Sequence, residues 1–181
     1  MIAAILLGIG LSASAGYRVF IPLLIASVAG KLGWIPLTDH FQWMGSSYSL
    51  ICFGTAAVVE IAAYYIPLVD NLLDTITTPL ALVAGTLLTT SVLPIDQDLL
   101  KWVTGIMVGG GSAGIIQMGT SILRLTSTKT TAGAGNPVVA TAEHGLALGQ
   151  SVMAIALPLI TGILVLVFLL FLLSKLLRLR R

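Results

Sequence analysis

Long apolar stretches separated by short polar segments dominate the sequence. Stretches without a charged residue run for 21 residues from Thr75 to Ile95, for 22 from Trp102 to Leu123 and for 30 from Gly145 to Ser174. Because about 20 mostly apolar residues are enough for a helix to cross a bilayer, each stretch is long enough for a membrane span. The pattern therefore predicts an all-α integral membrane protein.

Five transmembrane helices are predicted from the whole pattern. A single transmembrane domain covers 1–181, with spans at about 2–29, 48–66, 75–93, 102–123 and 146–173 and a basic tail at 174–181. The first span is rich in Gly, Ser and Ala and also holds Arg18 and Pro22. Such a cluster is typical either of two half-helices or of one helix packed closely on a neighbour. The stretch 125–144, rich in Thr, Gly and Ala, is expected to form an extramembrane loop or a short re-entrant element.

The composition excludes several other classes of protein. Only 9% of the residues are charged and the mean hydropathy is +1.05, whereas a soluble domain carries about 25% charged residues. The single cysteine, Cys52, excludes an internal disulfide and a cysteine-based metal site. His40 and His144 are isolated and no catalytic triad is visible, so we expect no enzyme activity, no cofactor and no metal. Basic residues gather in the tail rather than on one face, which argues against nucleic-acid binding.

Basic residues outside the predicted spans indicate the orientation of the chain. With the N-terminus outside the cell, the inner side carries basic residues at 31, 101, 175, 178, 180 and 181, and the outer side carries Arg124 and Lys129. Since cytoplasmic loops carry the excess of Lys and Arg, we expect a multi-pass membrane protein with an outer N-terminus and a cytoplasmic C-terminus. A broken first span that fails to cross would move the N-terminus to the other side.

Small residues recur at intervals of four in the first and fourth predicted spans. They are Gly8, Ser12 and Gly16 in the first span, and Gly105, Gly109, Gly110 and Gly114 in the fourth. Small residues at this spacing allow helix backbones to approach closely. We expect helix contacts here, within the chain or between the subunits of a homo-oligomer. A surface that lines a pore is the alternative.

The sequence contains one candidate internal repeat. A Ser-Ala-Gly triplet at 14–16 recurs at 112–114, 98 residues later. An odd number of predicted spans separates the two copies, so they would be inverted relative to each other, as in many secondary transporters. Chance is the alternative, because small residues are frequent in membrane helices.

Two charged residues lie inside predicted spans. Arg18 is near the middle of the first span and Glu60 is past the middle of the second. A charge at the centre of a membrane helix costs about 2.5–3.5 kcal/mol on insertion scales, so each should face protein or water and be paired. An Arg18–Glu60 ion pair is geometrically feasible and would mark a polar site or ion pathway. A static strut, or an arginine that caps a broken helix, is the alternative.

Five further polar residues complete the candidate site. Asp70 and Asp74 would share one helix face, where together with Asn71 they could hold a cation or receive protons. As cap and first-turn residues they would instead stabilise a helix. Gln117, inside the fourth span, is expected to bond to a neighbouring helix or to line a cavity. Glu143 is expected to cap the fifth span or to reach the polar site.

Four groups of residues resemble a known family. They are Gly16-Tyr17-Arg18 with Ile21-Pro22-Leu23-Leu24, Glu60 with the segment 66–74, the glycine-rich fourth span ending in Arg124, and Asn136-Pro137 with Glu143. The pattern Glu-x6-Pro-x2-Asp-Asn-x2-Asp is the most specific of them. On these residues the chain resembles the uncharacterised bacterial multi-span membrane proteins known as DUF4126. The resemblance implies a helical membrane fold and supplies no activity.

Costly buried charges in a small membrane chain make a transporter or channel for a small solute or ion the first functional hypothesis. In that case Arg18, Glu60 and Asp74 would carry the site. One alternative is a structural or accessory subunit of a membrane complex, in which the small-residue stripes contact another membrane protein. A further alternative is a lipid-binding membrane protein, in which Arg18 meets a phosphate headgroup. In each case the lipid bilayer is the immediate partner.

Overall fold

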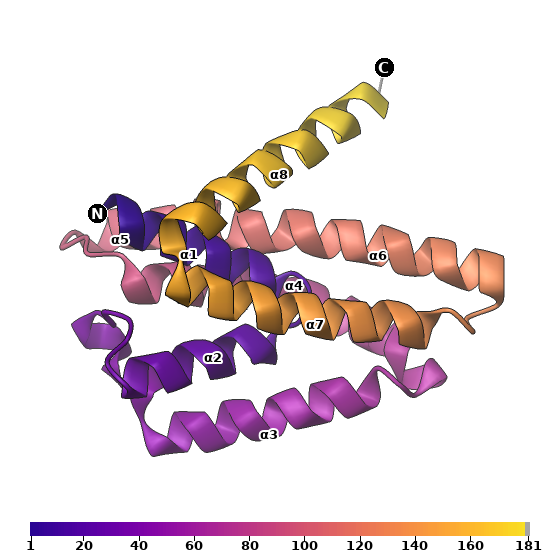
Figure 1. Ribbon diagram of the computed structural model, residues 1–181, viewed down its shortest axis with the longest axis horizontal. Coiled ribbons are helices and arrows are strands. Elements are labelled where there is room, and N and C mark those ends of the chain that lie inside the picture. The colour runs from indigo at the N-terminus through magenta and orange to yellow at the C-terminus, as the bar shows by residue number, and fades with distance from the viewer. Residues whose placement is uncertain (180–181) are drawn as a thin grey trace.

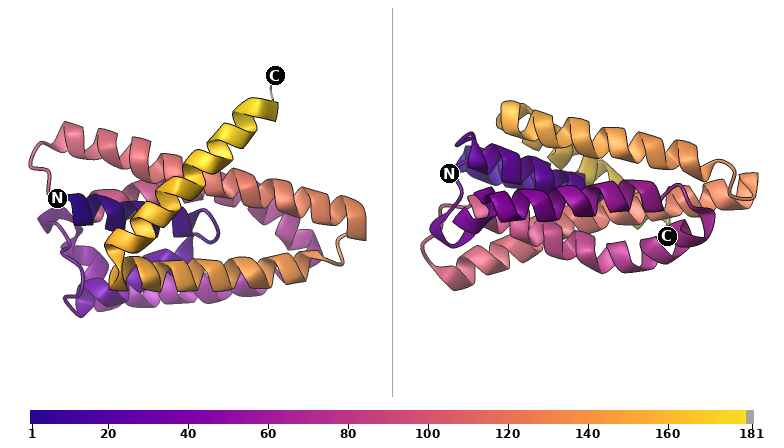
Figure 2. Two further views of the ribbon diagram at one scale, coloured as in Figure 1. Left: turned by 45° about the horizontal axis from the view of Figure 1, so that its top comes forward. Right: turned by 90° about the horizontal axis from the view of Figure 1, so that it is seen from below.

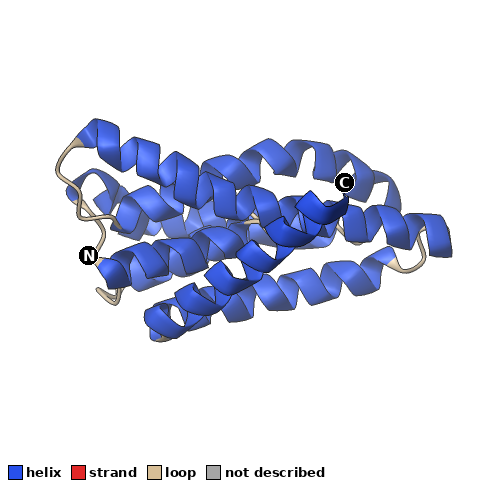
Figure 3. Ribbon diagram, turned by 90° about the horizontal axis from the view of Figure 1, so that it is seen from above, coloured by secondary structure: helices blue, strands red, loops and turns tan. Residues whose placement is uncertain are grey.

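The protein is a bundle of helices (Figure 1). The computed structural model describes residues 1–179, with side chains described everywhere except at 67, 68, 70–72, 74 and 175–179. The elements are α1 (Ile2–Ala15), α2 (Phe20–Lys31), the 3₁₀ helix η1 (Asp39–Gly45), α3 (Ser47–Ala63), α4 (Pro67–Val92), α5 (Asp98–Thr104), the π-helical η2 (Gly105–Gly110), α6 (Gly111–Thr131), α7 (Asn136–Ala156) and α8 (Pro158–Leu179). The described residues form no strand (Figure 3), so the predicted all-α class is confirmed.

Helices α1 and α2 form a hairpin that enters the bundle and returns. Gly8 packs against Thr89 and the Ser12 hydroxyl donates to the Gly85 carbonyl at 2.7 Å, so α1 runs antiparallel to α4. Helix α2 turns back, and the chain after it reaches the end of α4, where the Thr38 N–H donates to the Ser91 carbonyl at 2.8 Å. The N-terminus and the connector after α2 therefore lie at the same end of the molecule (Figure 1). Of the two alternatives for 2–29, the structure shows the two half-helices.

The number and bounds of the long apolar helices differ from the five spans expected. Two helices are long and apolar enough to cross a membrane, at Thr75–Val92 and in the continuous helix Asp98–Thr131. Helices η1 and α3 are bent by 62° at their junction, and if the pair counts as one span the number of candidate spans among the described residues rises to three. Helices α1 and α2 have 14 and 12 residues, fewer than the roughly 20 that cross a bilayer.

The expectation of one helix over 146–173 is wrong. Helix α7 ends at Ala156, and α8 begins at Pro158 and leaves α7 at a steep angle (Figure 1). Leu157 between them has a non-helical backbone, with φ −136° and ψ 63°. Proline disfavours the helical conformation of the residue before it and donates no N–H, so the helix breaks at this position.

The expectation of a loop or re-entrant element over 125–144 is also wrong. Helix α6 continues to Thr131 and α7 begins at Asn136, so two long helices meet at a short turn. Ala132 and Gly133 make this turn with φ values of 51° and 89°, in the left-handed region that ends helices.

Glycine-to-backbone contacts join α4 to the helix Asp98–Thr131. Helix α4 packs most extensively against η2. A Cβ added at Gly85 would lie 2.6 Å from the Gly109 carbonyl oxygen and 2.7 Å from the Ala113 methyl group. Side chains of Thr90, Thr86 and Leu82 similarly cover Gly105, Gly110 and Gly114.

The two Ser-Ala-Gly triplets lie against each other. Gly16 packs on the Ala113 carbonyl and on Ile116. One triplet ends α1, whereas the other lies inside the unbroken helix of α6. Their backbones therefore differ, and the local structure does not support an inverted repeat built on them.

The hairpin also changes the count of basic residues on the two sides. The count above placed Lys31 across the membrane from the N-terminus. In the structure, Lys31 ends α2 and Lys101 lies in α5, both at the end of the bundle where α1 begins. The same count also placed Lys101 across the membrane from the N-terminus. That part of the expectation is wrong because α1 and α2 together return to their starting side.

The hairpin predicts a labelling pattern. In a Cys52→Ser background, single cysteines at Ile2 and Leu32, both exposed, should react with a membrane-impermeant maleimide added to the same side. A cysteine at the exposed Lys129 position should react only from the opposite side. If Ile2→Cys and Leu32→Cys react from opposite sides, α1 and α2 cross the membrane and the hairpin is refuted.

The glycine contacts predict a difference between two matched substitutions. Gly85→Ala should lower the free energy of unfolding by about 1–3 kcal/mol, because its methyl group overlaps the Gly109 carbonyl and Ala113. Gly149→Ala, where nothing lies within 4 Å, should be neutral or stabilise by up to about 1 kcal/mol through helix propensity. Thermal unfolding in detergent compares them, and equal stabilities would contradict the close packing.

Candidate functional site

The tip of the α1–α2 hairpin is held by a carboxylate from α3. Glu60 Oε1 accepts the N–H of Val19 at 2.9 Å, and Oε2 accepts the N–H of Phe20 at 3.0 Å. These two N–H groups stand at the N-terminus of α2, where the first turn has no partner within the helix and the helix dipole favours negative charge. Glu60 therefore acts as a cap supplied by a neighbouring helix.

Arg18 projects from the same tip toward α7 rather than toward Glu60. Its Nη2 lies 2.8 Å from Oε2 of Glu143. The described side chains therefore do not form the direct Arg18–Glu60 ion pair that the sequence made feasible. The reason is that the backbone of the tip takes both oxygens of Glu60, while α7 places Glu143 beside the guanidinium.

Glu143 is shared by two arginines. Arg124, on α6, directs its Nε to both carboxylate oxygens, at 3.2 and 3.1 Å, and its Nη2 also contacts Oε2. The charged side chains around the tip are all buried: Arg18 is 3% exposed, Glu60 5%, Arg124 3% and Glu143 2%. Two guanidiniums and two carboxylates balance in formal charge, which lowers the cost of burying each one.

Neighbouring groups complete the hydrogen bonding of Arg18. Its Nε donates to Nδ1 of His144 at 2.7 Å, and its Nη1 donates to the Tyr17 carbonyl at 3.0 Å. Because Nδ1 accepts this bond, His144 is neutral here and its proton is assigned to Nε2. That nitrogen is buried and has no hydrogen-bond partner among the described residues.

Tyr64, at the end of α3, carries both guanidiniums on its ring. The Cζ atoms of Arg18 and Arg124 lie 3.6 and 4.2 Å from the ring centroid. Such cation–π contacts are worth roughly 0.5–2 kcal/mol, more when water is excluded. The Tyr64 hydroxyl lies 3.2 Å from that of Thr77, to which Gln117 Nε2 donates at 3.4 Å. The site therefore joins the hairpin to α3, α4, α6 and α7.

The structure brings four of the seven predicted site residues into one region. Arg18, Glu60 and Glu143 form its charged centre, and Gln117 joins it through Thr77. The side chains of Asp70, Asn71 and Asp74 lie outside the described residues. Among the described residues, no group of three or more His, Cys, Asp or Glu is arranged to hold a metal ion.

Three members of the site are absent from the sequence-based prediction. Arg124 looked like a flanking charge because 125–144 was expected to leave the membrane. His144 looked isolated, and no expectation was attached to Tyr64 in the second predicted span. The one available signal is helical spacing: Ala140 and His144 lie on one face of α7, and Arg18 contacts both, with its Nη2 3.5 Å from the Ala140 carbonyl.

A cavity of about 340 Å³ adjoins the tip of the hairpin on the side covered by α8. Tyr17, Ile116, Gln150 and Phe168 are among the side chains that line it. Helix α8 passes across the space between α6 and α7 at this face (Figure 2, left). The Tyr17 carbonyl accepts the hydrogen bond from Arg18 Nη1 at 3.0 Å, so the cavity reaches the edge of the charged centre.

The cap contact predicts a graded series of stabilities. Glu60→Leu removes both acceptors, and each buried N–H left unpaired costs about 1–3 kcal/mol. Glu60→Gln keeps one carbonyl oxygen and should cost less. Tyr65→Phe, which removes an exposed hydroxyl contact with Thr141, should stay within about 0.5 kcal/mol of wild type. Thermal unfolding measures the series; a Glu60→Leu variant as stable as Tyr65→Phe would rule out the cap.

Comparison with known proteins places the chain in a family. The model of a domain of unknown function, DUF4126, matches residues 5–178. No curated protein and no solved structure matches the chain. The match covers nearly the whole sequence and includes every residue of the site described above, so the family expected from the sequence is confirmed. The chain belongs to the DUF4126 family.

Proposed function

We propose that this protein is a small transporter or channel of the bacterial inner membrane, and that the charged centre at the hairpin tip is the site used by its solute or ion. The observation that carries the proposal is the sharing of Glu143 by Arg18 and Arg124 at the tip of a re-entrant helical hairpin. Ionisable residues inside membrane segments are costly, and in membrane proteins they mark solute and ion pathways.

The arrangement supports an exchange of partners. Glu60 occupies the two N–H groups of a helix N-terminus, which is a general anion-binding position. Glu143 lies between two cations, so a small movement of its carboxylate changes how the two arginines are neutralised. A solute anion that binds one of the two arginines would leave Glu143 paired with the other. The cavity beside Tyr17 supplies a route to the site.

We also propose an orientation for the chain. The C-terminal segment carries Lys175, Arg178, Arg180 and Arg181. Helix α8 starts at the end of the bundle that holds the N-terminus and leads away from it, in the direction of the exposed Lys129 (Figure 1). Lys31, the last residue of α2, and Lys101, in α5, lie at the end of the bundle that holds the N-terminus. The excess of basic residues favours a cytoplasmic C-terminus and an outer N-terminus.

A structural or accessory role is the second candidate. Every charged side chain described at the hairpin tip has a partner, which also fits a fixed strut that holds helices together. Exposed apolar side chains on α8, such as Leu164 and Leu170, provide surface for a homo-oligomer or for another membrane protein. A heteromer in native mass spectra would favour this role over independent transport.

Flux into proteoliposomes tests the proposal. The wild-type protein should carry at least one of H⁺, K⁺, chloride and phosphate faster than empty vesicles. Glu143→Gln and Arg18→Gln should slow that flux by about tenfold or more, the factor that roughly 1.4 kcal/mol supplies. Lys129→Gln, an exposed charge change at the end of α6, is the matched control and should leave the flux unchanged.

Two results would count against transport by this site. One is a folded wild-type protein that carries none of these solutes. The other is a flux that Glu143→Gln and Arg18→Gln leave at the wild-type rate while their melting temperatures show that both variants are folded.

A further inference from the structure

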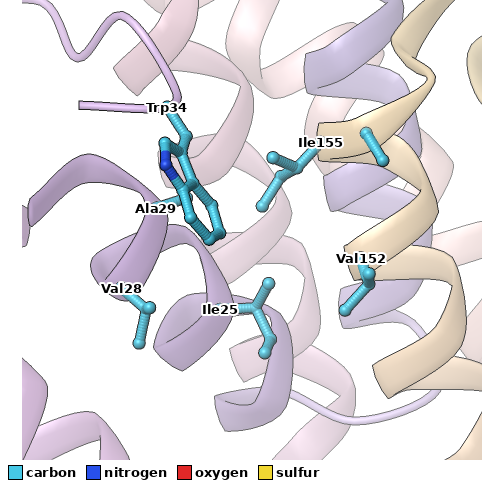
Figure 4. Close-up of a pocket in the computed structure, with 7 residues that line it drawn as sticks. Ile25, Val28, Ala29, Trp34, Val152 and Ile155 are labelled. Carbon is cyan, nitrogen blue, oxygen red and sulfur yellow. The ribbon is translucent and has the colours of Figure 1, made fainter. Parts of the chain in front are cut away.

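An apolar groove lies between α2 and α7, away from the charged centre (Figure 4). Its volume is about 460 Å³, within the roughly 300–1,000 Å³ of small-molecule sites. Ile25 and Val28 of α2 form one wall, and Val152 and Ile155 of α7 form the other. The Trp34 indole stands across one end (Figure 4). Among the lining side chains, the only polar atom is the indole nitrogen.

The groove opens at the outer surface of the bundle. Trp34 is 68% exposed and Val152 is 49% exposed. The backbone N–H of Trp34 donates to the Ala29 carbonyl at 2.8 Å, which fixes the backbone of Trp34 at the end of α2. Tryptophan is enriched where headgroups meet acyl chains, because its ring is apolar and its N–H is polar. The indole therefore fits the headgroup level, and the aliphatic walls fit the hydrocarbon beside it.

Water is a poor occupant for this groove. A buried water needs about two to four polar partners, and the lining side chains offer one N–H group. Empty space would leave the wall atoms without dispersion contacts on one side. Hydrocarbon satisfies the walls, and in a bilayer the hydrocarbon at this depth belongs to lipid tails.

We infer that this groove is a binding site for one acyl chain of a phospholipid from the surrounding bilayer. The chain lies between α2 and α7, and its headgroup end is at Trp34. The inference does not depend on the proposed transport function, because it follows from the groove alone. It does bear on the charged centre, since α2 and α7 meet there as well.

The two sites occupy opposite ends of one helix contact. Ile21 and Ala147 belong to one buried apolar cluster between them. Beyond that contact, Arg18, in the turn just before α2, meets Glu143 and His144 of α7. A lipid chain in the groove would therefore set the spacing of the two helices that carry the ion pair.

Photo-crosslinking tests the acyl-chain site. The full-length protein is reconstituted in phosphatidylcholine vesicles that contain a phosphatidylcholine with a diazirine on one acyl chain. After illumination, peptide mapping locates the adducts. Labelling at Val152 and Ile155 should saturate with probe and be lost on competition with unlabelled lipid. Labelling of exposed α8 side chains such as Leu170 should rise linearly, as expected for lipid in passing contact.

A matched pair of variants gives a second readout. Val152→Phe places a larger side chain in the groove and should abolish the saturable labelling at Ile155. Leu146 is also on α7, is similarly exposed and lies outside the groove. The Leu146→Phe variant should therefore keep the saturable labelling at Ile155. Uniform, non-saturable labelling of wild type overturns the inference, whatever the variants do. The inference is also overturned if the Val152→Phe protein is folded and still shows the wild-type saturable labelling at Ile155. Both readouts are independent of flux, so they separate this inference from the transport proposal.

Discussion

The carboxylate of Glu143, bound by Arg18 and Arg124, is the contact on which the arrangement of this fold depends. Helices α1 and α2 are each too short to cross a bilayer, so the chain turns back inside the bundle and leaves polar backbone at the turn. Glu60 satisfies the N–H groups there, and Glu143 neutralises the arginine that the turn carries. Without these two carboxylates the hairpin would bury unpaired donors and an unpaired charge.

Buried ion networks and close backbone packing play different roles in this bundle. Replacing a buried ion pair by apolar residues is often neutral or stabilising, so the charges are weak evidence for stability and stronger evidence for a defined arrangement or a function. Stability comes from packing such as the contact of Gly85 with Gly109, where helix backbones touch. The charged centre lies apart from that contact, where the tip of the α1–α2 hairpin and the end of α3 meet the sides of α6 and α7.

The helical membrane class and the burial of Arg18 and Glu60 could be predicted from the sequence, because charges inside long apolar runs are costly and should be shielded. The broken first segment was one of two alternatives, and Glu143, outside the predicted spans, was expected either to cap a helix or to reach the polar site. The partners of these charged residues could not be predicted, because Arg18 reaches Glu143 only after the α1–α2 hairpin has turned back. The polar stretch 125–144 was misleading for a local reason. Its Thr side chains bond to carbonyls four residues earlier, as Thr130 does to Thr126, which satisfies them within a helix.

A double-mutant cycle of Arg18→Gln and Glu143→Gln, followed by unfolding in detergent, tests most directly whether this shared carboxylate holds the hairpin. Glu143→Gln takes the shared carboxylate from two buried arginines and should cost roughly 3–5 kcal/mol. Arg18→Gln should cost less, because Arg124 still pairs with Glu143. The double variant should be more stable than the sum of the two losses implies, with a coupling of roughly 0.5–3 kcal/mol. Additive losses would show that the two side chains act independently and would contradict the account.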